Sequence, residues 1–125
     1  MDIVSAPGAP AAVGPYSHGV RTGGLLFCSG QVALRPGSSR LVGDSVAAQT
    51  TQVFANIRAV LEAAGATLGD VVKTTVFLTT MDDFGAMNAV YGEAFGDHRP
   101  ARSTVAVAGL PLGALVEIET VVRVG

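Results

Sequence analysis

The sequence has little charge, no tryptophan and a single cysteine. Asp, Glu, Lys and Arg together make up 14% of the 125 residues, well below the roughly 25% of an ordinary soluble domain. The net charge of −2 lacks the basic excess of a nucleic-acid-binding protein. Cys28, standing alone, excludes an internal disulfide and fits a reducing compartment. Because the chain has so little charge for its surface, and 49% of its residues are hydrophobic, we expect an oligomer to bury part of that surface.

Long apolar runs are also missing. The run from Leu25 to Cys28 has the length of a strand and falls far short of the ~20 residues of a membrane span. The N-terminus carries Asp2 and has no basic region followed by an apolar core, so no secretory signal is expected. These features predict a cytoplasmic protein that binds neither membranes nor nucleic acids. The length predicts one domain, residues 1–125, in which residues 1–13 form an irregular lead-in.

Several kinds of catalytic site lack their usual residues. His18 and His98 are isolated and belong to no metal-binding spacing, so no metal site is expected. The glycine-rich stretches lack the lysine of a phosphate-binding loop. Cys28 lies in an apolar run without a neighbouring base, which favours a buried structural thiol over a nucleophile. Ser17 and His18 would point apart in an extended chain, which argues against a hydrolase pair.

Hydrophobic periodicity predicts two helices between short strands. The first helix is expected from Asp44, as N-cap, to Gly65, and the second from Asp82 to Phe95, followed by Gly96. Thr80 with Asp83 resembles a capping box. Strands are expected near residues 20–21, at 25–29 with a possible continuation over 32–34 after a bulge at Gly30, at 71–78, and twice within 100–125.

The segment from Pro100 to Gly125 contains the only polar pair that suggests chemistry. In the last strand, alternate residues from Val116 to Val124 form an apolar face, whereas Glu117 and Glu119 lie on the other face. Arg102 opens the preceding strand. An arginine can bind a carboxylate through two parallel hydrogen bonds, and a glutamate can orient or deprotonate a water. The alternative is an Arg102–Glu117 ion pair on a solvated sheet face, which would be structural only.

Short motifs in a fixed order extend over most of the chain, and together they closely resemble the RidA/YjgF family. The resemblance covers roughly Gly14 to Val122. The motifs are Gly14-Pro15-Tyr16-Ser17-His18, Ser29-Gly30-Gln31, Ala63-Ala64-Gly65, Asp70-Val71-Val72-Lys73-Thr74, Asp82-Asp83-Phe84 with Asn88 and Tyr91, Pro100-Ala101-Arg102-Ser103, Leu110-Pro111, and Val116-Glu117-Ile118-Glu119.

The resemblance implies an α+β fold of the chorismate-mutase-like (bacillus) type, with two helices packed on one face of a sheet. It also implies a homotrimer with active sites in the clefts between subunits. The implied activity is cofactor-independent hydrolysis of reactive 2-imino or enamino acids to 2-keto acids and ammonia. Arg102 would bind the substrate carboxylate and Glu117 would position the attacking water. The residues implied to line the pocket are Tyr16, Ser29, Gly30, Phe84, Asn88 and Thr104.

Two departures from the family pattern accompany the resemblance. The segment between Tyr91 and Pro100 looks shorter than in some members, and Thr104 stands where many relatives carry cysteine. Arg102 is retained, which favours a deaminase. Two alternatives stay open, namely a non-catalytic trimer that binds a small metabolite or a protein partner, and an enzyme acting on a different enamine.

Overall fold

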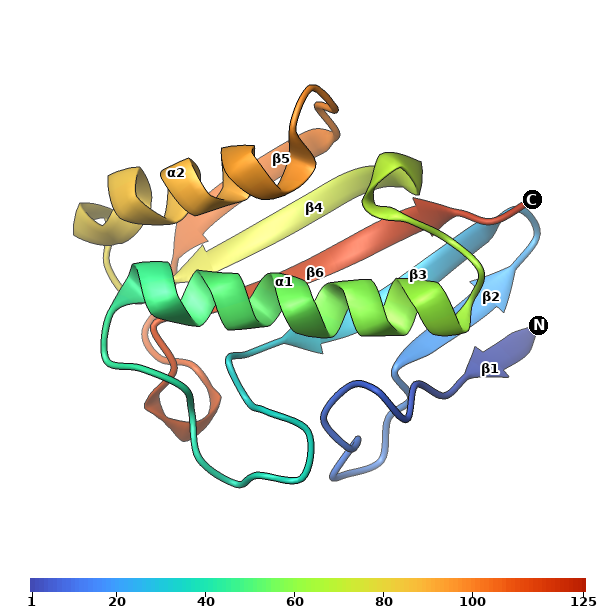
Figure 1. Cartoon of the computed structure of the whole chain (residues 1–125), viewed down its shortest axis with the longest axis horizontal. Coiled ribbons are helices and arrows are strands. Elements are labelled where there is room, and N and C mark those ends of the chain that lie inside the picture. The colour runs from blue at the N-terminus through green and yellow to red at the C-terminus, as the bar shows by residue number, and fades with distance from the viewer.

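The computed structural model describes all 125 residues. They form one mixed sheet, two helices that pack on the same face of it, and the segments that connect these elements (Figure 1). The 6-stranded sheet has the order β1-β2-β3-β6-β4-β5. Only β4 and β5 are parallel, and every other pair of neighbours is antiparallel. The expected α+β architecture is therefore confirmed. The strands are β1 (Asp2–Val4), β2 (Gly19–Thr22), β3 (Leu25–Gln31), β4 (Val71–Leu78), β5 (Ala101–Ala106) and β6 (Val116–Arg123).

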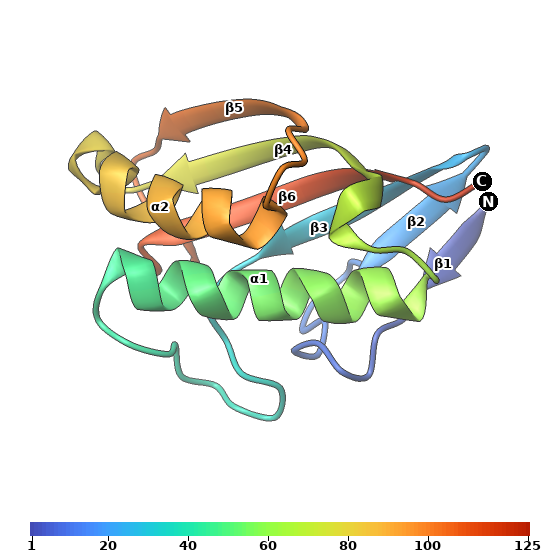
Figure 2. The ribbon, with the colours of Figure 1, turned by 45° about the horizontal axis from the view of Figure 1, so that its top comes forward.

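The last strand lies in the middle of the sheet, as its alternating sequence suggests. β6 pairs with β3 on one side and with β4 on the other. Val116, Ile118 and Val122 are fully buried beneath the helices, so the predicted apolar face is the core face. The residues between them, including Glu117 and Glu119, consequently point to the other face of the sheet. Figure 2 shows that no helix covers this other face.

Helix α1 (Val46–Ala63) lies along the sheet and supplies much of the core. Its N-cap is Ser45, whose hydroxyl accepts a hydrogen bond from the Ala48 N–H at 3.1 Å. The expected N-cap, Asp44, was wrong by one residue because Ser45 has the extended backbone that lets its side chain reach the first turn. At the other end, Gly65 adopts a φ of 74°, which suits glycine and ends the helix as predicted.

Two amides that the helical pattern places away from the core are buried. The Gln49 side chain accepts a hydrogen bond from the Leu115 N–H at 2.9 Å. The Asn56 side chain donates to the carbonyl oxygens of Val32 and Leu34 at 3.0 and 2.7 Å. Both amides make hydrogen bonds to backbone groups of irregular segments that lie next to α1. Because these partners are far away in sequence, the helical periodicity of α1 does not predict that the two amides are buried.

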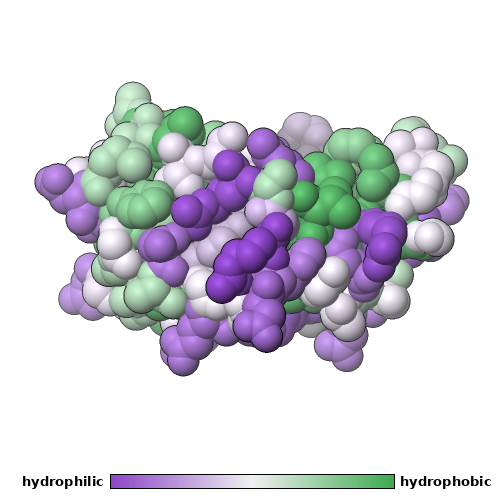
Figure 3. All heavy atoms as spheres, turned by 90° about the horizontal axis from the view of Figure 1, so that it is seen from above, coloured by the Kyte–Doolittle hydropathy of each residue, from purple (hydrophilic) through white to green (hydrophobic).

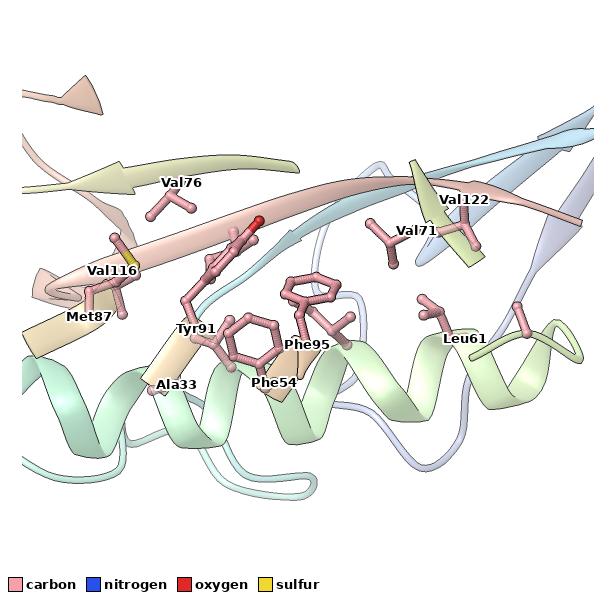
Figure 4. Close-up of a cluster of buried hydrophobic side chains, with 14 of the residues drawn as sticks. Ala33, Phe54, Leu61, Val71, Val76, Met87, Tyr91, Phe95, Val116 and Val122 are labelled. Atoms are coloured by element: carbon pink, nitrogen blue, oxygen red, sulfur yellow. The ribbon is translucent and has the colours of Figure 1, made fainter. Parts of the chain in front are cut away.

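Helix α2 (Phe84–Phe95) packs beside α1 through aromatic side chains (Figure 4). Phe54 of α1 meets Tyr91 and Phe95 edge-on, with ring centroids 5.7 and 5.5 Å apart. Aromatic pairs of this kind contribute about 0.5–1.5 kcal/mol beyond their buried area. The helix starts two residues later than predicted, because Met81–Asp83 form a 3-10 turn in which the Thr80 hydroxyl accepts the Asp82 N–H.

Three strand predictions need correction. Residues 2–4, assigned to the irregular lead-in, form the edge strand β1. The irregularity at Gly30 is confirmed, since the register of β3 against β6 shifts between Cys28 and Gln31, but residues 32–34 do not continue the strand. The two strands of the C-terminal segment are not neighbours, because β4 lies between β5 and β6. Neither helix combines the length and apolar character that a membrane crossing requires.

Candidate active site

Arg102 lies on the helix-covered side of the sheet, at the edge formed by β5. It is paired with Thr74 of β4, whose side chain is buried beneath α2. Its guanidinium carbon lies 4.6 Å from the centre of the Tyr91 ring and 5.4 Å from that of Phe84. One guanidinium nitrogen, Nη1, donates to the Asn88 side-chain oxygen at 2.7 Å. Helix α2 thus holds the arginine from three directions.

The spacing of α2 explains this arrangement. Phe84, Asn88 and Tyr91 are four and three residues apart, so their side chains lie on one face of the helix. The Tyr91 hydroxyl is fixed by the buried Thr74 hydroxyl at 2.8 Å, and Figure 4 shows it pointing from the helix towards the sheet. A cation over an aromatic face gains about 0.5–2 kcal/mol. The remaining N–H donors of Arg102 stay available for a carboxylate.

Arg102 opens onto a cleft of about 470 Å³ between the end of α2 and the start of β5. The size suits a small metabolite. Seen from this side, hydrophilic side chains gather across the middle of the molecule between hydrophobic patches (Figure 3). The lining residues are Asn88, Tyr91, Gly92, Phe95, Arg99, Pro100 and Arg102.

Glu117 lies on the opposite side of the sheet. It is paired with Phe77 of β4, and its neighbours Val116 and Ile118 point into the core, so its carboxyl group faces the uncovered side. Partial burial raises the pKa of Glu117 above that of an ordinary glutamate, and the negative charge of Glu119 raises it further. A carboxylate that is partly desolvated in this way is a stronger base than a free one.

Gly30 of β3 lies against Glu117. A Cβ atom at position 30 would come within 2.5 Å of the Glu117 Oε2 atom, so any side chain there would displace the carboxyl group. Tyr16 is 53% exposed and lines a small hollow together with Gly30. Glu117 and Gly30 therefore form a second group of predicted site residues, separate from the one around Arg102, and Tyr16 shares the hollow beside Gly30.

Ser29 fixes the segment that carries Tyr16. Its hydroxyl donates to the Ser17 carbonyl oxygen at 2.6 Å, and its N–H donates to the His18 carbonyl oxygen at 3.0 Å. The Ser29 hydroxyl, which was predicted to bind substrate, therefore helps to hold the backbone next to Tyr16 in place. The antiparallel register of β3 against β2, which pairs Cys28 with Gly19, brings Ser29 to these carbonyls, a contact that the Ser-Gly-Gln motif alone does not reveal.

Two residues that the sequence reasoning did not place in the site support it. Tyr91 belongs to one of the family motifs but was not among the residues implied to line the pocket, although its ring lies against Arg102. His18 joins the lead-in to the fold: its Nδ1 accepts the Ala6 N–H at 3.0 Å, and its Nε2 donates to the Pro10 carbonyl oxygen at 2.7 Å. The four- and three-residue spacing from Phe84 to Tyr91 was a usable signal for Tyr91, whereas an isolated histidine carries none.

Thr104 lies two residues beyond Arg102 on the same face of β5, next to Val76. Its hydroxyl is buried and has no hydrogen-bond partner within the chain. Cys28 is also partly buried, and this burial raises the pKa of its thiol, which agrees with the expected structural role. No three His, Cys, Asp or Glu side chains converge anywhere in the structure.

The structure divides the predicted site residues between the two faces of the sheet. Arg102, Asn88, Phe84 and Thr104 lie on the helix side, and Glu117 lies on the uncovered side with Gly30. The suggested Arg102–Glu117 ion pair is wrong, because β4 separates their strands and their side chains point to opposite faces. The only ion pair in the chain joins Arg123 to Asp70 at 3.3 Å.

Comparison with known proteins identifies the family. The profile described as Endoribonuclease L-PSP matches residues 7–124. A 2-iminobutanoate/2-iminopropanoate deaminase of Escherichia coli is 44% identical over 121 residues, which cover 94% of each chain. The chain belongs to the RidA/YjgF family.

Other RidA/YjgF relatives carry different functional names. A putative regulator, AldR, of Lactococcus lactis is 47% identical over 124 residues, covering 99% of this chain and 98% of that protein. The crystal structure of a putative endoribonuclease from Thermotoga maritima superposes with a TM-score of 0.94 at 47% identity, covering 98% of this chain and 97% of the other. The crystal structure of the Escherichia coli YjgF gene product gives a TM-score of 0.92 at 42% identity, covering 98% of both chains. Fold and family agree throughout, whereas the names divide between deaminase, regulator and nuclease.

Proposed function

We propose that this RidA/YjgF protein hydrolyses reactive 2-imino or enamino acids to 2-keto acids and ammonia without a cofactor. The observation that carries the proposal is Arg102, which α2 holds in place with part of its guanidinium free at the mouth of a metabolite-sized cleft. Every substrate of this class has a carboxylate next to the C=N carbon, and a planar guanidinium matches that carboxylate with two hydrogen bonds. The deaminase name of the Escherichia coli relative supports the same assignment.

The proposed chemistry needs one water and no redox step. With the carboxylate bound to Arg102, a water adds its oxygen to the C=N carbon, and a base takes the proton of the water as the bond forms. The base passes this proton to the imine nitrogen, which gives the neutral carbinolamine. The base then moves the hydroxyl proton of the carbinolamine to the nitrogen, which leaves as ammonia, and the ketone of the 2-keto acid remains. Glu117 is the proposed base, since partial burial raises its pKa towards that of a useful proton acceptor.

We further propose that each site is assembled from two copies of the chain. Arg102 and Glu117 of one chain face opposite sides of the sheet, so one small substrate cannot touch both. The Glu117 side of the sheet also exposes the large apolar residues Leu25, Phe27 and Val105, an arrangement that favours burial against a neighbouring copy. The family resemblance narrows the assembly to a closed trimer.

Ammonia release from freshly generated 2-iminobutanoate tests the activity. We expect the protein to accelerate both ammonia and 2-oxobutanoate formation over the spontaneous reaction, in equal amounts, in metal-free buffer containing a chelator. Binding of 2-oxobutanoate with no acceleration of hydrolysis would instead favour the alternative, a trimer that binds a metabolite without converting it.

Co-assembly of two impaired variants tests the shared site. Chains carrying Arg102→Lys and chains carrying Glu117→Gln are each expected to form trimers with at most about a tenth of the wild-type activity. When the two are co-expressed, about one quarter of the sites in randomly mixed trimers should combine the intact Arg102 of one chain with the intact Glu117 of the other. Recovery of roughly that fraction of wild-type activity supports the two-chain site.

Sedimentation equilibrium on the same preparations should report three chains per particle. Mixed trimers as inactive as their parents would place both groups in one chain, and a stable active monomer would overturn the assembly altogether.

A further inference from the structure

The cleft at Arg102 contains a second guanidinium. Arg99 lines it from the segment that joins α2 to β5, and Asn88, Tyr91 and Phe95 contribute further walls. No acidic side chain lines this cleft. Two cations and no anion in one concave site give it a positive potential and a preference for negatively charged ligands.

Backbone carbonyl groups near the end of α2 hold the Arg99 side chain in place. Its Nη1 donates to the carbonyl oxygens of Gly96 and His98, which follow the end of α2. Carbonyl groups at the C-terminal end of a helix carry partial negative charge and bind cations. Both contacts use the same nitrogen, so the Nη2 and Nε donors keep hydrogen-bonding capacity for a ligand.

The short connection after α2 determines which residue faces the cleft. Only three residues separate Gly96 from Pro100, and the middle one, His98, is anchored to the core side by a 2.6 Å contact between its Nε2 and the Val71 carbonyl oxygen. Arg99 precedes a proline, which keeps it out of helical conformation. With His98 held against β4, the Arg99 side chain is left at the rim beside Arg102.

We propose that Arg99 forms a second carboxylate subsite, so that this protein prefers 2-imino acids whose side chain carries a carboxylate. The inference rests on the proposed function, because it takes Arg102 as the group that binds the 2-carboxylate. In the dicarboxylic substrate the second carboxylate meets the free donors of Arg99, whereas a neutral side chain of equal length gains nothing there and a basic one is repelled.

Matched substrates and a matched charge change provide the test. The substrates are 2-iminoglutarate and 2-iminopentanoate, which share the five-carbon chain and differ in the terminal carboxylate. We expect the wild-type kcat/KM to be about five- to tenfold higher for the dicarboxylate, as one charge-assisted contact would give. Arg99→Gln should abolish this ratio by lowering only the 2-iminoglutarate value. The control Arg58→Gln removes the same charge from α1, outside the cleft, and should leave the ratio unchanged.

Keto-acid binding separates this inference from the proposed function. Calorimetry with 2-oxoglutarate and 2-oxopentanoate should show the same preference in the wild type and the same loss in Arg99→Gln. If no imine is hydrolysed but this binding preference holds, the deaminase assignment fails and the Arg99 subsite stands. If imines are hydrolysed without preference, or Arg99→Gln affects both substrates equally, the subsite is overturned and the deaminase assignment stands.

Discussion

Replacing Glu117 by glutamine is expected to lower kcat/KM on 2-iminobutanoate by ~100-fold or more, the usual contribution of a general base. Glutamine keeps the shape of the side chain and its place beside Gly30, but it cannot accept a proton from water. Binding of 2-oxobutanoate should survive the change, because Arg102 still holds the carboxylate. Ammonia release and keto-acid affinity, measured on the same preparation, therefore separate a catalytic loss from a binding loss.

Glu119→Gln is the matched control, since Glu119 lies two residues away on the same face of β6. At neutral pH this variant should be nearly silent. The charge of Glu119 contributes to the raised pKa of Glu117, so its removal should lower that pKa. The base must be deprotonated to act, and the acidic limb of the pH–rate profile should therefore move to lower pH in Glu119→Gln.

Two results would contradict this assignment. An inactive Glu119→Gln beside an active Glu117→Gln would mean that the wrong glutamate has been chosen. Two active variants would mean that no general base operates here and that the site only holds the imine for attack by ordinary water.

Arg102→Lys is expected to lower kcat/KM on 2-iminobutanoate at least tenfold, which corresponds to a loss of roughly 1.4 kcal/mol of transition-state stabilisation. Lysine keeps the charge but cannot bind a carboxylate through a planar pair of donors. It also loses the guanidinium plane that lies over Tyr91 and the hydrogen bond to Asn88 in its present geometry. The affinity for 2-oxobutanoate should fall in parallel, because the same contact binds product and transition state.

The control for this exchange is Arg123→Lys. Arg123 is an exposed arginine at the end of β6 whose partner is Asp70, and a lysine there can keep the ion pair. It should retain full activity, and both variants should melt close to the wild type, since neither position belongs to the buried core. Wild-type kinetics for Arg102→Lys would return Arg102 to a purely structural role.

The sequence predicts the elements of this fold better than their relative placement. Alternation in β6 and the helical period of α1 depend on neighbouring residues, so both could be read directly from the chain. The position of β4 between β5 and β6 depends on contacts between distant segments. For that reason the sequence made Arg102 and Glu117 look like partners, whereas the sheet directs them to opposite sides.

In the candidate site, too, some residues could be predicted from the sequence, whereas contacts between distant segments could not. Arg102, Asn88 and Phe84 were proposed from the family resemblance, and the structure brings these three together. The contact of Arg102 with Tyr91, by contrast, depends on the parallel register of β5 against β4, which brings Arg102 beside the Thr74 hydroxyl that holds the Tyr91 ring. Register between strands far apart in sequence is fixed by tertiary packing, so the role of Tyr91 became visible only in three dimensions.

The pairing of both chain ends with one hairpin has a consequence for folding. Asp2 pairs with Arg21 of β2, and the Val124 N–H donates to the carbonyl oxygen of Gly24 in the β2–β3 turn. Opening this hairpin removes the partners of both ends at once, so the two ends belong to one cooperative unit. Docking of the C-terminal end must close a loop spanning most of the chain, and the entropy of that closure favours its formation late in folding.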